Sequence, residues 1–139
     1  MRRGVSVLAA VFCLGVVAGC GDGGDAGKVV PTDYKAALAE LGEALKSTAA
    51  DGKKPPTRMA EFEMIEPMAP TAGPLIRSGE LIYLWGGGYV PSGTKVVAYQ
   101  KKAEAEGGPV LLQDGTVKVM TADEVKAAPK AGTAGAGKK

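Results

Sequence analysis

The sequence predicts an α+β fold. In it, an N-terminal helix packs on a small three- to four-stranded antiparallel meander, and a short C-terminal helix and a disordered tail follow. Apolar residues recur at helical spacing between residues 34 and 45, and β-branched and aromatic residues dominate between 80 and 100. An Asp-Gly pair at 114–115 then separates two apolar runs. A helix followed by successive strands is typical of α+β domains.

The first helix is predicted to start after Thr32 or Asp33, whose side chains can accept hydrogen bonds from free backbone N–H groups. It should end at Asp51-Gly52, and Pro55-Pro56 prevents its resumption. Four apolar side chains fall on one helical face, which indicates the side that packs on the rest of the domain. They are Tyr34, Leu38, Leu41 and Leu45.

A second, short helix is expected after Thr57, which can cap it. Met59, Phe62 and Ile65 share one side of that helix, and Pro67 and Pro70 stop it. A further helical turn is expected at residues 74–77 before Ser78-Gly79.

Strands are expected at residues 80–85 and 95–100. In the first, Leu81, Tyr83 and Trp85 alternate onto one face, and the second is β-branched and aromatic. The glycine-rich segment 86–93 and the charged segment 101–108 are predicted to be loops.

The segment 109–120 is predicted to be a β-hairpin with Asp114-Gly115 in a type I′ turn. That turn would pair Gln113 with Thr116, Leu112 with Val117, and Val110 with Val119. The following Thr121 and Glu124 have capping-box spacing, so a short helix is expected that ends before Pro129. Residues 129–139 consist almost entirely of Ala, Gly and Lys and are expected to be disordered.

The N-terminus has the three parts of a secretory signal: Arg2-Arg3, an apolar stretch, and small residues before a polar break. The apolar stretch has about 15 residues, whereas a membrane-spanning helix needs about 20. Val17-Ala18-Gly19-Cys20 resembles a bacterial lipobox. The resemblance implies cleavage between Gly19 and Cys20 and a diacylglyceryl group on the Cys20 sulfur. A plain signal peptide with a chance cysteine, or a short uncleaved anchor, are the alternatives.

The predicted organisation is therefore a signal peptide at 1–19, a flexible Gly/Asp-rich tether at 20–30, one α+β domain at 31–128 and the tail at 129–139. Without the signal the chain keeps 15 basic and 15 acidic residues, so no nucleic-acid partner is predicted. The chain has no His, and Cys13 would leave with the signal. No metal or other cofactor is therefore expected.

Residues 95–128 resemble the C-terminal end of bacterial pseudopilin-like proteins. The similarity rests on Val97-Ala98-Tyr99-Gln100, Gly107-Gly108 and the run from Val110 to Val117. The family pattern is a strand, an Asp-Gly turn, a second strand and a short helix. It has a His where this chain has Glu104, and a polymerising N-terminal helix where this chain has the lipobox.

Candidate chemical groups are few. Glu61, Glu63 and Glu66 form an acidic cluster that could serve acid–base chemistry or hold Ca²⁺, although a solvated face explains it better. Ser47, Ser78 and Ser92 lie in no nucleophile motif. Trp85 and Tyr89 flank the triple glycine and are predicted as a ligand surface.

These features predict a lipid-anchored envelope protein with a non-enzymatic interaction or structural domain. It would be exported and held on the outer side of the cytoplasmic membrane or at the outer membrane. Its partners would be the membrane, through the N-terminal lipid, and an envelope protein or polymer. The alternatives are an accessory component of a pseudopilin-like secretion or pilus system, and an envelope hydrolase that uses carboxylates or a Ser–Lys pair.

Overall fold

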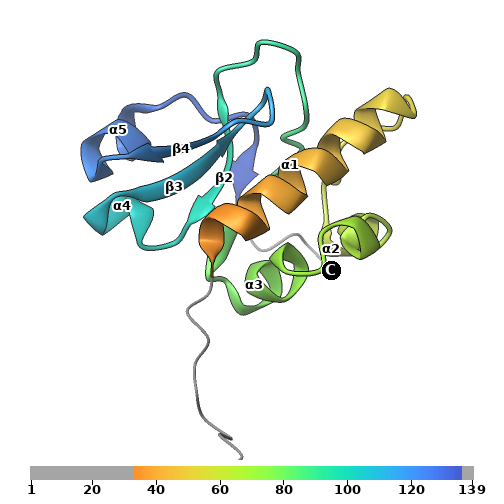
Figure 1. Ribbon diagram of the computed structural model, residues 1–139, viewed down its shortest axis with the longest axis horizontal. Helices are drawn as coiled ribbons and strands as arrows, with labels where there is room; N and C mark the ends of the chain where they lie inside the picture. The colour runs from red at the N-terminus through yellow and green to blue at the C-terminus, as the bar shows by residue number, and fades with distance from the viewer. Residues whose placement is uncertain (1–32, 136–139) are drawn as a thin grey trace, which may run out of the picture. The chain divides into compact units, whose positions relative to one another are not determined.

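A five-stranded antiparallel sheet lies at the centre of the computed structural model, in the order β4-β3-β2-β1-β5 (Figure 1). The structure describes residues 33–135. The strands are β1 (Leu81–Trp85), β2 (Val96–Gln100), β3 (Gly108–Leu112), β4 (Val117–Met120) and β5 (Thr133–Ala134). Strands β1 to β4 form the expected meander, and the α+β fold class is confirmed. The predicted signal peptide, tether and lipidation site, with Gly19 and Cys20, lie outside the described residues.

Helix α1 (Tyr34–Ala50) has the predicted bounds and cap. The Asp33 carboxylate accepts hydrogen bonds from the backbone N–H groups of Lys35 and Ala36, at 3.0 and 3.1 Å. Its predicted apolar face packs on the sheet, where Leu38 and Leu41 are completely buried. Gly42 sits at the contact with the β3–β4 turn, since a Cβ there would lie 3.0 Å from Leu111 Cδ1.

The segment after α1 contains the predicted short helix and the predicted helical turn at residues 74–77, with a 3₁₀ turn between them. It forms α2 (Met59–Phe62), the 3₁₀ turn η1 (Glu66–Met68) and α3 (Ala72–Ser78). Thr57 does not cap α2 as expected. Instead, its backbone N–H and its hydroxyl both donate to the Glu61 carboxylate, each at 2.9 Å. Phe62 and Ile65 are buried, as the sequence predicts.

The β3–β4 hairpin exists, but its register differs by one residue from the prediction. Leu111, rather than Leu112, pairs with Val117, and Pro109 pairs with Val119. Gly115 has φ of 85°, whereas Asp114 is not among the residues with positive φ. A type I′ turn needs positive φ at both positions, so the turn is instead a three-residue loop with a left-handed glycine. The Gly115 N–H donates to Leu112 O at 3.0 Å, and the Leu112 N–H to Thr116 O at 2.9 Å.

Two segments expected to be irregular are ordered. The charged segment 101–108 contains α4 (Ala103–Glu106), which buries Ala103. The expected disordered tail is corrected for residues 129–135, because Pro129 and Ala131 bond to the backbone of Val96 and β5 pairs with β1. The remaining tail positions, 136–139, lie outside the described residues. Helix α5 (Ala122–Ala127) has the predicted capping box at Thr121 and Glu124.

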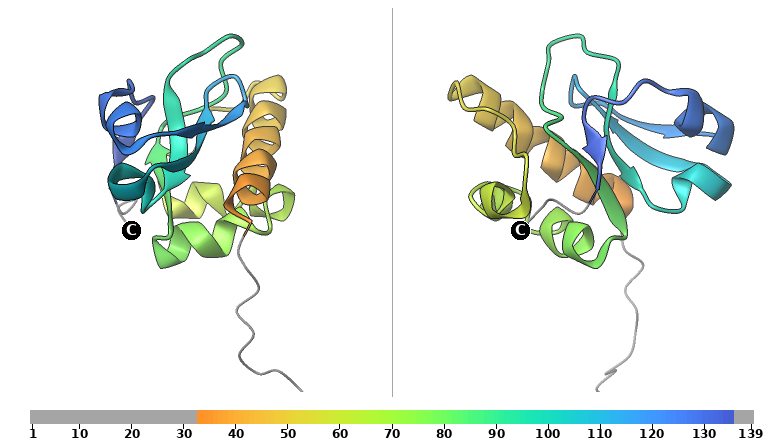
Figure 2. Two further views of the ribbon diagram at one scale, coloured as in Figure 1. Left: turned by 60° about the vertical axis from the view of Figure 1, so that its left-hand side comes forward. Right: turned by 180° about the vertical axis from the view of Figure 1, so that it is seen from behind.

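Helices flank both faces of the sheet (Figure 2), and apolar side chains are buried beneath them on each face. On one face α1, α2 and α3 cover Leu81, Tyr83 and Trp85. On the other, α4 and α5 cover a smaller cluster that includes Tyr99. A register shift between Val96 and Ala98 lets consecutive β2 residues face the α1 side. The sheet is therefore fixed from both sides, and its edges are the exposed parts.

Candidate functional site

Trp85 and Tyr89 lie in different surroundings. Trp85 is 9% exposed and belongs to an aromatic cluster, with ring centroids 5.0 Å from Tyr83 and 6.4 Å from Phe62. Tyr89 is half-buried and lines a separate hollow of about 360 Å³ beside Lys53. The two residues of the predicted ligand surface therefore line two different hollows.

The triple-glycine loop between these residues is held by backbone contacts. The Tyr83 hydroxyl donates to Gly87 O at 2.5 Å, and the Gly86 N–H donates to Pro56 O at 2.8 Å. Burial raises the pKa of Tyr83, so this hydroxyl stays a donor across the physiological pH range. These bonds fix the backbone of the loop at the end of β1.

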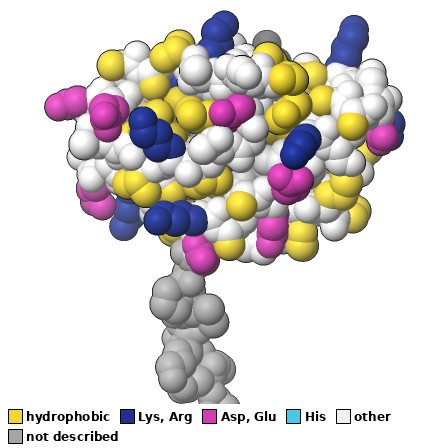
Figure 3. Space-filling model, turned by 45° about the horizontal axis from the view of Figure 1, so that its top comes forward, with side chains coloured by type: hydrophobic (Ala, Val, Ile, Leu, Met, Phe, Trp, Pro, Cys, Tyr) yellow, Lys and Arg dark blue, Asp and Glu magenta, His cyan; other side chains and the backbone are white. Residues whose placement is uncertain are grey.

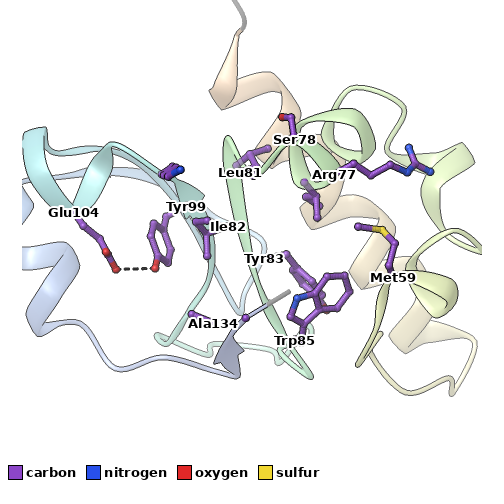
Figure 4. Close-up of a pocket in the computed structure, with 14 residues that line it drawn as sticks. Met59, Arg77, Ser78, Leu81, Ile82, Tyr83, Trp85, Tyr99, Glu104 and Ala134 are labelled. Carbon is purple, nitrogen blue, oxygen red and sulfur yellow. Dashed lines mark hydrogen bonds between the residues drawn. The ribbon is translucent and has the colours of Figure 1, made fainter. Parts of the chain in front are cut away.

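A groove with a volume of about 550 Å³ lies along the outer edge of β1 (Figure 4). Its walls come from β1, from the C-terminal half of α3, from Met59 and from Ala134 of β5. Figure 4 shows Met59, Tyr83 and Trp85 on one side of β1, and Tyr99 with Glu104 on the other. We call this cavity the β1-edge groove.

The backbone of β1 contributes polar groups to this groove. The Lys101 N–H donates to Glu80 O at 2.8 Å. This bond shows that the backbone groups of Glu80 point toward β2. In an antiparallel ladder, the backbone N–H and C=O groups of successive residues point to opposite sides of the strand. Those of Ile82 therefore point toward β2, whereas those of Leu81 and Tyr83 point away from it. Within residues 33–135, strand pairing on the outer edge is recorded only at Leu84 and Trp85, opposite β5. Leu81, Ile82 and Tyr83 line the groove, and Leu81 and Tyr83 are only 1% and 2% exposed there.

Two of the three charged side chains that line the groove, Arg77 and Glu104, are already engaged. Arg77 makes a two-pronged ion pair with Glu66, and this contact raises the pKa of Arg77. The Tyr99 hydroxyl donates to Glu104 Oε1 at 2.7 Å, and Lys130 Nζ lies 4.9 Å from the Tyr99 ring centroid. Burial, together with the bond to Glu104, raises the pKa of Tyr99. The groove thus offers apolar side chains and backbone groups, with Lys101 as a further charged side chain in its lining.

On the face shown in Figure 3, acidic and basic side chains are scattered singly among hydrophobic ones. This matches the equal numbers of acidic and basic residues after residue 19. Such a surface does not form the single-sign field that attracts a polyanion.

The three acidic residues of the predicted cluster are not brought to one centre. Glu61 binds Thr57 and Arg58, and Glu66 binds Arg77. Glu63 is exposed. Within the described residues, no group of three or more His, Cys, Asp or Glu side chains is placed to hold a metal ion.

The three serines are also apart. Ser47 is exposed on α1, whereas Ser78 lines the β1-edge groove and donates to Leu75 O at 3.1 Å. Ser92 has φ of 60° in a turn closed by the Gly93 N–H on Val90 O. Met59, Ile76 and Ala134 are among the groove residues that the sequence does not mark as site residues. These residues are far apart in the sequence, so the sequence alone does not show that they lie together in the fold.

A second apolar surface lies around Met64 and Met68, which are 75% and 45% exposed. Both line a hollow of about 430 Å³ together with Pro55, Pro56 and Ile65. Methionine is common at adaptable binding surfaces. This hollow lacks the backbone edge that gives the β1-edge groove its specific chemistry.

Comparison with protein families, curated proteins and solved structures finds no match to this chain. Among residues 33–135, no helix is long and apolar enough to cross a bilayer.

Proposed function

We propose that this protein is a lipid-anchored component of the cell envelope whose domain binds a partner protein through the β1-edge groove. The partner would supply an extended segment that adds to the outer edge of β1. The anchor would be the lipid on Cys20, on the outer side of the cytoplasmic membrane or at the outer membrane.

The observation that carries the interaction is the outer edge of β1 at Leu81 to Tyr83. Proteins normally cover or charge such an edge, because it pairs readily with other chains. Here, within residues 33–135, Leu81, Ile82 and Tyr83 carry no charge and line a groove of mixed apolar and charged side chains. Added strands gain affinity from main-chain hydrogen bonds and specificity from pockets for alternate side chains.

The walls of the groove favour an extended, partly apolar segment. Ile76 and Trp85 are almost completely buried, so they form a firm wall, whereas Met59 is half-exposed and can adapt. A strand beside β1 would place every second side chain toward this wall. The remaining side chains would face Ile82 on the other side of the sheet.

The anchor is supported by the lipobox-like Val17-Ala18-Gly19-Cys20. More than one acyl chain is needed for stable attachment, since a single chain gives only marginal membrane binding. Cys20→Ser should abolish incorporation of labelled palmitate or glycerol and leave an unprocessed precursor. Undiminished labelling in that variant would contradict the anchor.

Binding can be tested by capturing partners from the native envelope with the full-length, lipidated protein. Ser78→Trp places an indole in the groove, and Ser47→Trp makes the same change on the exposed face of α1. A protein that is recovered with the wild type and with Ser47→Trp, but lost with Ser78→Trp, supports the proposal. Equal recovery with both variants would place the binding surface elsewhere.

A further inference from the structure

We propose that Met64 and Met68 form a modification site, at which an oxidant of the peroxide class converts both thioethers to sulfoxides while the fold stays intact. Neither residue lines the β1-edge groove, so the inference goes beyond the proposed binding function and does not depend on it. It rests on the exposure of the two side chains, on the hollow that they share and on their separation from the core.

The four methionines of residues 33–135 fall into two groups. Met64 and Met68 are 75% and 45% exposed, whereas Met59 and Met120 are partly buried. Met59 packs against the core cluster on the α1 face of the sheet, and Met120 packs against the cluster beneath α4 and α5. Met64 and Met68 belong to neither cluster.

The backbone between α2 and η1 turns Met64 away from the core. The Met64 N–H donates to Glu61 O at 3.3 Å, and the Ile65 N–H donates to Phe62 O at 2.9 Å. This is the spacing of a 3₁₀ turn, in which residues three apart lie on the same side. The buried Phe62 and Ile65 form the inner side, so Met64, one residue before Ile65, points outward.

Both exposed methionines line one hollow, which has a volume of about 430 Å³. A peroxide molecule is little larger than water, so it can reach either sulfur without any opening of the fold. Lys53 and Lys54 line the same hollow. A sulfoxide oxygen accepts hydrogen bonds, and the ammonium groups of these lysines, like water, are donors that can satisfy it.

The oxidation is a transfer of one oxygen atom to each sulfur. A lone pair of the thioether sulfur attacks one oxygen of hydrogen peroxide, the O–O bond breaks and an S–O bond forms. The transferred oxygen gives its proton to the departing hydroxide, which leaves as water. The sulfur loses two electrons and the peroxide gains them, so no further reductant or oxidant is needed.

Oxidation of this pair changes a surface and leaves the core unchanged. The sulfoxides replace two apolar side chains of the hollow with polar ones that stay in contact with water. At Met59 or Met120 the same change would bring a polar oxygen against packed apolar side chains, where an unpaired polar group is costly. Of the four methionines, the exposed pair is therefore the one that the fold can carry in the oxidised form.

Timed peptide mapping of the full-length protein in hydrogen peroxide tests the site. Tryptic peptides separate Met120 from the other three methionines, and fragment-ion spectra locate each added oxygen within a peptide. Met64 and Met68 should each be oxidised at least about tenfold faster than Met59 or Met120, because the oxidant must reach the sulfur. Similar rates at all four methionines would overturn the proposal.

Leucine variants test whether the exposed pair accounts for the rapid phase. Met64→Leu combined with Met68→Leu keeps the side-chain volume and removes both sulfurs. The rapid uptake of oxygen should disappear in this variant, and the slow rates at Met59 and Met120 should not change. Met120→Leu is the matched control and should keep the whole rapid phase. A rapid phase that persists in the double variant would contradict the assignment.

Thermal unfolding separates a tolerated modification from damage to the fold. A peroxide dose that converts only Met64 and Met68 should leave Tm unchanged. Met64→Gln combined with Met68→Gln, which carries polar side chains of similar length, should also melt like the wild type. Met59→Gln should lower Tm, because it places the same polar group against the core. A fall in Tm that follows the first two oxygens would overturn the proposal.

Discussion

Gly115 should be the most sensitive residue of the β3–β4 turn. Its φ of 85° lies in the left-handed region, and a Cβ added there would be 3.9 Å from the Tyr89 ring, so there is room for a methyl group. The cost of Gly115→Ala is therefore conformational. An L-residue in this region costs about 1–2 kcal/mol. The lower backbone entropy of the unfolded alanine chain offsets about 0.5–1 kcal/mol of that.

The net loss of about 1 kcal/mol should appear in thermal unfolding followed by circular dichroism. For a domain of about 100 residues it corresponds to a fall in Tm of roughly 4–8 °C. Gly135→Ala is the matched control, because a Cβ there meets nothing within 4 Å and no left-handed φ is involved. An unchanged Tm for Gly115→Ala would refute the assigned turn.

A second substitution distinguishes the observed turn from a type I′ turn. In a type I′ turn Asp114 would also have positive φ, and Asp114→Gly would relieve strain. In the observed turn the Asp114 carboxylate accepts a hydrogen bond from the Thr116 N–H at 2.9 Å. Asp114→Gly should therefore lower Tm slightly. A higher Tm would contradict the observed register.

Three further substitutions test local geometry. Ser92→Gly should raise the stability by about 0.5 kcal/mol in the same melting assay, because φ at this position is 60°; a lower Tm would count against that backbone conformation. Gly132→Ala should destabilise the domain by about 1–3 kcal/mol, since its Cβ would lie 2.5 Å from the carbonyl oxygens of both Leu84 and Trp85; wild-type melting would mean that β5 does not lie there. The backbone N–H of Thr121 lowers the pKa of Glu124 below its usual 4.5, so this cap stabilises the fold above that pH and is lost as the pH falls through the folded pKa. Glu124→Gln should therefore flatten the loss of Tm between about pH 5 and 3, and an unaltered acid profile would contradict the cap.

The sequence predicts those elements whose signals are local. Asp33 and the leucines at helical spacing define α1, and the spacing of Thr121 and Glu124 defines the start of α5. The Asp114-Gly115 pair locates the hairpin but does not fix its register. It suits both a two-residue turn and a three-residue loop with a left-handed glycine.

Elements stabilised by distant contacts were not predictable in the same way. Helix α4 buries only Ala103 among charged neighbours, so it has no amphipathic pattern. Strand β5 consists of Thr133 and Ala134, which are both exposed. It is held by backbone pairing with β1, and no hydrophobic pattern in the sequence signals such pairing. The β1-edge groove joins Met59, Ile76 and Ala134, and only the folded chain brings these residues together. Of the predicted ligand pair, Trp85 lines it and Tyr89 does not.

The central claim is that the β1-edge groove contacts a partner polypeptide in the envelope. The most direct measurement places a photo-reactive diazirine residue at Ser78 or, as control, at Ser47 of the full-length, lipidated protein, and irradiates it in its native envelope. We predict a discrete, protease-sensitive adduct at Ser78 and none at Ser47. Adducts of equal yield at both positions, no adduct at Ser78, or an adduct resistant to protease would contradict the claim.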